Sequence, residues 1–241
     1  MQTLTGKAVN YSVRDTYQDG DQRQFEGRIP EVGTRAVFED GREYIFASTN
    51  VDLSIGRVAA QIGSVEAVAS GTTLYGVPEV KVELAGIQEN EYAGGYLSLP
   101  FGDISYKVKS NSAADGSDIA TFVLEEVPYT AVANNEPLRL SKSRSSDVVL
   151  GTATNLGVGV TVSESTAGTD LTTTYLWLQT CGVGGVLVSV GATAINGAAL
   201  MQTAAGAMVV QTSGKMQLAQ SIESASVGDG GVAAVVLNFP S

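Results

Sequence analysis

The chain has 241 residues, 44% of them hydrophobic and only 16% charged, so it can form one large β domain or two small ones and is too poor in charge for disorder. Its 28 glycines and 6 prolines interrupt the sequence too often for long helices, which predicts an all-β protein. Fourteen basic and 25 acidic residues give a net charge of −11, which disfavours direct binding to nucleic acid.

Several classes of active site lack the side chains that they need. The chain has no histidine, which excludes Ser-His-Asp triads and His-ligated metals. Cys181 is the only cysteine, so no intrachain disulfide or multi-cysteine zinc site can form, and we expect a buried structural thiol. The first seven residues lack an apolar signal segment, and no stretch reaches the ~18 apolar residues of a membrane helix. We therefore expect neither classical secretion nor a membrane span.

Residues 1–34 are predicted to form an extended N-terminal arm. Between Asn10 and Pro30, single apolar residues stand among polar ones without helical or strand period. Such a segment buries too little surface to order itself, so it is either disordered or ordered against a partner. Aromatic and arginine side chains are the usual anchors of such contacts. The candidates for contact with such a partner are Arg14, Tyr17, Arg23, Phe25 and Arg28.

The clearest local signal is a β-hairpin in residues 36–46, where Asp40-Gly41 separates two apolar-rich runs. A two-residue type I′ loop would pair Glu39 with Arg42, Phe38 with Glu43 and Val37 with Tyr44. Further turns are expected at Asp19-Gly20, Asp115-Gly116, Asn196-Gly197 and Asp229-Gly230.

Two runs in the middle of the chain, 80–84 and 104–109, alternate apolar with polar side chains and predict half-buried strands. Residues 57–70 are ambiguous. Val58, Ile62, Val65 and Val68 would line one face of an amphipathic helix, but Gly63 weakens that interpretation.

Residues 151–241 hold only Lys215 and four acids, five charges in 91 residues. A chain normally covers its outside with charge, so this region is predicted to contact neighbouring subunits. Its short apolar runs, 185–191, 207–210 and 232–237, predict strands buried on both faces. Trp177 stands in an alternating run and is predicted to be a core residue or a subunit-contact anchor.

The remaining motifs favour turns and solvated faces. The glycines at 157–159 and 182–185 lack the Gly-Lys-Ser/Thr of a phosphate loop. The acidic turns at 19–21 and 115–118 lack the further ligands of a calcium loop. Glu125 and Glu126 would point to opposite faces of a strand, so they are no catalytic pair. We predict no catalytic residue, no metal and no cofactor.

Four phrases of the sequence together resemble structural proteins of tailed bacteriophages, of the kind that decorate or cement the head. They are Gly33–Phe46, Asn90–Leu97, Tyr106–Asn111 and Tyr175–Gly182. The stretch 197–237 is similar in texture to small β-barrel decoration modules. The resemblance implies a non-enzymatic virion protein on the outer capsid surface, made in the host cytoplasm. It also implies a trimer that clamps neighbouring units of the major capsid protein.

The expected architecture is therefore all-β, with β-sandwich or β-barrel-like domains. Residues 1–34 form the arm, residues 35–150 a β domain and residues 151–241 a C-terminal β-barrel-like domain. Other virion roles, as a tail, fibre or major capsid protein, stay open, although no uninterrupted run is long enough for the spine helix of the usual capsid fold. A glycan-binding surface module, with Trp177 and exposed tyrosines as stacking platforms, is the alternative from another class.

Overall fold

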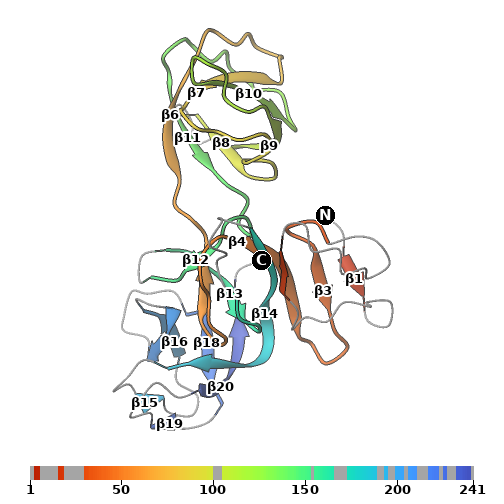
Figure 1. Ribbon diagram of the computed structural model, residues 1–241, viewed down its shortest axis with the longest axis vertical. Helices are drawn as coiled ribbons and strands as arrows, with labels where there is room; N and C mark the ends of the chain where they lie inside the picture. The colour runs from red at the N-terminus through yellow and green to blue at the C-terminus, as the bar shows by residue number, and fades with distance from the viewer. Residues whose placement is uncertain are drawn as a thin grey trace. The chain divides into compact units, whose positions relative to one another are not determined.

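The computed structural model divides the chain into two compact units, shown in Figure 1. Unit 1 comprises residues 1–61 and 145–241, and unit 2 comprises residues 62–144. The residues that the structure describes are 3–5, 16–18, 30–99, 105–152, 155–165, 173–188, 193–194, 199–203, 206–210, 217–222, 225–226 and 232–239. Both units are built from β-strands, as expected. Within the described ranges, no helix has the length and apolar character to cross a bilayer.

Unit 2 is a closed barrel of six antiparallel strands. In barrel order, β6 neighbours β7, followed by β10, β9, β8 and β11, which returns to β6. The strands are β6 (Val65–Ala69), β7 (Glu79–Glu83), β8 (Tyr96–Ser98), β9 (Ser105–Asn111), β10 (Ile119–Leu124) and β11 (Pro137–Ser141).

Alternation along these strands builds the barrel interior. In β7 and in the first five residues of β9, every second side chain is buried and the others are exposed, which confirms the two half-buried strands expected from the sequence. Tyr92 and Phe122 pack inside with ring centroids 5.7 Å apart. The other large buried side chains of this core are Ile87, Leu97, Leu99, Tyr106, Leu124, Leu138 and Leu140.

Unit 1 is one large mixed sheet with a small second sheet beside it. Its main path runs β1-β3-β4-β14-β20-β18-β16-β17, with β2 and β13 also paired to β14, and β5 paired to β12 and β13. The strands of this sheet are β1 (Thr3–Thr5), β2 (Thr16–Gln18), β3 (Arg35–Val37), β4 (Glu43–Thr49), β5 (Val58–Ala60), β12 (Val149–Leu150), β13 (Gly157–Thr161), β14 (Thr174–Leu187), β16 (Ala199–Gln202), β17 (Met208–Val210), β18 (Ala219–Ser221) and β20 (Val232–Asn238). The second sheet pairs β15 (Thr193–Ala194) with β19 (Ala225–Ser226).

The division of the chain differs from the domains expected at 35–150 and 151–241. The closed barrel is formed by the middle of the chain, whereas residues 30–61 share a sheet with the C-terminal region. The reason is long-range pairing: β4 lies beside β14 over Thr174–Cys181. The helix considered for residues 57–70 is wrong, because β5 and β6 occupy this segment and the boundary between the units falls after Gln61.

The predicted hairpin is present, but its loop and register differ from those expected. Val37 pairs with Glu43 and Ala36 with Tyr44. The Phe38 N–H donates to Arg42 O at 2.9 Å, and the Gly41 N–H donates to Phe38 O at 3.0 Å, which defines a three-residue loop. Only Gly41 has a positive φ, of 82°, whereas a type I′ turn needs two such residues.

Two further expectations change in detail. The turn at residues 115–118 exists, but the positive φ lies on Asp118 and not on Gly116. The apolar runs 185–188 and 232–237 alternate between inner and outer faces, so the expectation of strands buried on both faces is wrong for them. The other expected turns lie outside the described residues.

Gly95 offers a test of the barrel packing. A Cβ added there would overlap the carbonyl oxygen of Ser141 and lie 2.9 Å from the carbonyl carbon of Lys142, backbone atoms at the end of β11. We expect Gly95→Ala to destabilise the protein by on the order of 1–3 kcal/mol, as overpacking does. Gly116→Ala is the matched control, because no heavy atom lies within 4 Å of its added Cβ. Thermal unfolding followed by circular dichroism measures both; equal transitions would contradict the expected barrel packing.

Candidate interaction surfaces

The predicted N-terminal contacts are only partly described. Tyr17 lies in β2, where its backbone pairs with Tyr175 of β14. Strand β1 pairs in parallel with β3, so two short segments of the expected arm belong to the sheet of unit 1. The other four candidates, Arg14, Arg23, Phe25 and Arg28, lie outside the described residues, and their role remains a prediction.

Trp177 lies in the core of unit 1. Its side chain has no exposed surface, and its ring packs against Phe46 with centroids 5.0 Å apart. Phe46 also stacks on Tyr175 at 6.0 Å. Because a subunit contact or a sugar platform needs an accessible face, the core interpretation holds and Trp177 is removed from both roles.

The thiol and carboxylate side chains that were considered as possible sites either stabilise local structure or are exposed. Cys181 is half-buried and not fully buried as expected. The Asp115 carboxylate accepts hydrogen bonds from the backbone N–H groups of Ile119 and Ser117, which lower the pKa of Asp115 below its ordinary value of 3.8. Its contribution to the turn is therefore present above that value and is lost as the pH falls through the lowered pKa. Glu125 pairs with Lys107 at 2.6 Å. In the part of the chain that the structure describes, no group of three His, Cys, Asp or Glu side chains could hold a metal ion.

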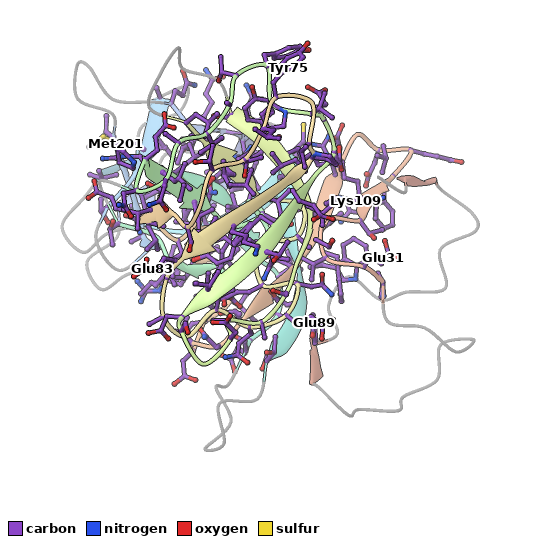
Figure 2. The ribbon with its side chains drawn as sticks, turned by 90° about the horizontal axis from the view of Figure 1, so that it is seen from above. Glu31, Tyr75, Glu83, Glu89, Lys109 and Met201 are labelled. Carbon is purple, nitrogen blue, oxygen red and sulfur yellow. The ribbon has the colours of Figure 1, made fainter. Side chains whose placement is uncertain are left out.

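One end of the unit 2 barrel carries exposed apolar side chains on two adjacent loops. Thr73 and Val132 exchange two backbone hydrogen bonds of 2.9 and 3.0 Å, and the Leu124 N–H donates to Pro78 O, so the intervening loops lie side by side. Figure 2 shows the Tyr75 side chain extending outward from its loop. We call this set the barrel-end patch: Leu74 (67% exposed), Tyr75 (70%), Val77 (39%), Val127 (42%) and Tyr129 (64%).

Acidic residues flank the barrel-end patch. Glu79 follows the first loop, and Glu125 and Glu126 begin the second, all three exposed. The Lys107 ammonium is bound to Glu125. The patch therefore combines a large apolar area with a rim of predominantly negative charge, which favours a partner with basic side chains around an apolar centre.

A groove of about 570 Å³ lies elsewhere on unit 2. Buried Ala67, Leu99 and Leu138 form part of its wall. Arg139 and Glu66 also line the groove and form an ion pair of 2.8 Å that is mostly exposed. Exposed pairs of this kind contribute little to stability.

Unit 1 exposes an apolar sheet face. Val183 of β14 and Val236 of β20 are directly paired across the strands and are 56% and 40% exposed. The same side of the sheet continues over Gly185 and Ala234, which also pair with each other. We call this surface the valine face; its exposed members are Val183, Ile222, Val232 and Val236.

A hollow of about 630 Å³ adjoins the valine face. Ile55, Gly185 and Val232 line its apolar side. Its polar side includes Arg42, whose guanidinium donates to Asp40 at 2.6 Å and to the Tyr44 hydroxyl at 3.3 Å. The hydrogen bond to Asp40 raises the pKa of Arg42. The remaining lining residues are Tyr44, Gly56, Thr161, Val162, Ser163, Glu164 and Gln179.

The chain matches no protein-family model, and searches of curated proteins and of solved structures found no significant similarity. The sequence predicted subunit contacts somewhere in the charge-poor residues 151–241, but it indicated neither the residues of the valine face nor the barrel-end patch. Residues 232–237 are apolar at every position, which suggested burial on both sides, and the alternation of exposed and buried side chains is visible only in the structure. The exposed residues around 74–77 and 127–129 lie in loops, where no periodic signal exists.

Proposed function

We propose that this chain is a structural protein of a bacteriophage virion that decorates the outer capsid surface, binds the major capsid protein and associates with further copies of itself, as a trimer. The observation that carries the proposal is the presence of two separate exposed apolar surfaces, the barrel-end patch on unit 2 and the valine face on unit 1. Contiguous apolar surface of this kind is typical of protein contacts. The resemblance of residues 33–182 to head proteins supplies the particular role.

The two surfaces differ in a way that suits a decoration protein. The valine face contains no ionisable side chain, whereas the barrel-end patch has an acidic rim. A protein that joins its own copies and also a different protein needs two surfaces of unlike chemistry. This combination supports a role in holding subunits together.

Glycan binding is a second candidate, favoured by the exposure of Tyr75 and Tyr129 on neighbouring loops. Tyrosine faces stack on sugars, and the carboxylates of Glu125 and Glu126 could accept hydroxyl hydrogen bonds. A glycan array with the wild-type chain and with Tyr75→Ser tests it. Binding that the substitution abolishes would support a glycan module, and an array without signal would leave decoration as the proposed function.

Immunoelectron microscopy of particles from the phage that encodes the chain tests the virion role. We expect antibodies against the chain to label the capsid exterior at regular positions, because a decoration protein is repeated over the shell. Label confined to the tail or the fibres would replace this role with another virion position. Particles without label, although they contain all other structural proteins, would overturn the proposal.

The arm residues can be ranked by comparing Phe25→Ala with Arg23→Ala. A rim ion pair is worth about 0.2–1 kcal/mol, whereas a buried aromatic anchor is worth about 2 kcal/mol or more. We therefore expect Phe25→Ala to lower capsid occupancy and survival of heated particles more than Arg23→Ala. Loss with the arginine change alone would contradict aromatic anchoring, and normal occupancy with both would remove the arm from the contact.

A further inference from the structure

We propose that the valine face is the surface through which copies of this chain associate, so that its occupant is the same face of a second copy. The inference deepens the self-association in the proposed function, on which it rests, and does not depend on a capsid. Three properties of the face carry it: its exposure, its shape and its lack of charge.

The exposure of the face is high for a β-sheet surface. Val232 is 61% exposed and Val183 56%. On the opposite side of the same strands, Val186 and Val235 are fully buried. Among the described residues, the inner side of these strands is therefore buried, whereas the valines of the outer side are exposed, with the exposed Gln220 of β18 beside Val236. Covering the outer face would remove valine and isoleucine surface from water, which is the main favourable term in association.

The centre of the valine face is formed by small residues, with larger ones on either side. Gly185 pairs with Ala234 there, with the Val183–Val236 pair on one side and the Leu187–Val232 pair on the other. Small residues flanked by larger ones allow two sheets to pack at the usual spacing of about 10 Å with their side chains interdigitated. The hollow beside Ile55 and Val232 adds a recess next to this centre.

The distribution of charge indicates that a second copy of the chain binds the valine face. None of β14, β18 and β20 contains an aspartate, glutamate, lysine or arginine. The chain as a whole carries a net charge of −11, so contact between most other parts of two copies brings like charges together. At the barrel-end patch, Glu79, Glu125 and Glu126 would meet the same residues of the other copy. The charged residues Arg42 and Glu164 line the hollow beside the valine face, but the valines themselves meet an identical surface without desolvating a charge.

A basic or acidic partner fits this face less well. Such a partner would bury its charges against valine and glycine, where the strands offer no counter-charge, and an unpaired charge in an interface is strongly unfavourable. An identical face has no such charge to bury. The chemistry of the surface therefore favours self-association over binding to a charged protein.

Sedimentation velocity of the full chain at increasing micromolar concentrations tests the proposal with the protein alone as probe. We expect the wild type to self-associate, and Val236→Glu to raise the dissociation constant by at least about 30-fold, since it places a carboxylate in the interface. Val127→Glu is the matched control: residue 127 is also a valine, is 42% exposed against 40% for residue 236, and lies in the barrel-end patch. It should leave the association unchanged.

Trp177 fluorescence and circular dichroism establish that each variant is folded. If Val236→Glu does not fold, Val232→Glu, at a more exposed position of the same face, replaces it. A wild type that stays monomeric overturns the proposal, as does association that Val236→Glu leaves intact or that Val127→Glu weakens equally. Capsid labelling with a monomeric free protein would retain decoration and reject the valine face, so the two failures are distinguishable.

Discussion

The bend in β14 is the constraint on which unit 1 depends. This strand pairs with β4 along its first half and with β20 along its second half, with a register irregularity between Gln179 and Cys181. The buried Gln179 amide donates to Cys181 O at 3.1 Å and to Val183 O at 2.8 Å, which holds the bend by hydrogen bonds within the strand. Gly182 adopts a φ of 84° there, where a Cβ would lie 2.9 Å from the Arg42 backbone. Before the bend Trp177 is buried in the core; after it Val183 is exposed, so one strand supplies both the core and the valine face.

The insertion of unit 2 is compatible with this sheet because of where the chain leaves and re-enters it. Strand β5 ends at Ala60 and β12 begins at Val149, and these two residues are paired neighbours. The Ala60–Val149 pair brings together the two ends of the segment that forms unit 2. Because this segment folds into its own barrel, closing it costs less conformational entropy than closing an open loop of the same length. Unit 2 also has a core of its own, made of residues between Ala67 and Leu140. Each unit therefore buries its apolar residues in a core of its own.

Local sequence patterns predicted the structural features that depend on residues close together in the chain, namely single strands and a hairpin. The alternation in 80–84 and 104–109 predicted half-buried strands, which are β7 and β9 of the structure, because a half-buried strand shows its period directly. The hairpin at 36–46 was predicted, but Asp40 uses its carboxylate to bind Arg42 and the loop gains one residue, which changes the register. Long-range pairing was not predictable in this way. Nothing in residues 43–49 indicates a partner at 174–181, so the discontinuous unit 1 did not follow from the sequence. A core position for Trp177 was one of two predictions, but Phe46 as its neighbour was not predictable.

The distribution of charge gives the two exposed surfaces different preferences for a partner. An apolar surface can bind any partner with a complementary apolar surface, unless nearby charges discriminate among partners. The carboxylates at the barrel-end patch repel a second copy and favour basic groups, whereas the uncharged strands β14 and β20 repel nothing and offer no compensation to a charged partner. Discrimination at the first surface is therefore electrostatic and should weaken as salt screens it, while contact at the second is governed by apolar burial and shape, which salt affects much less. The proposed self-association and the proposed contact with a different protein therefore depend on separate surfaces and on different physical interactions.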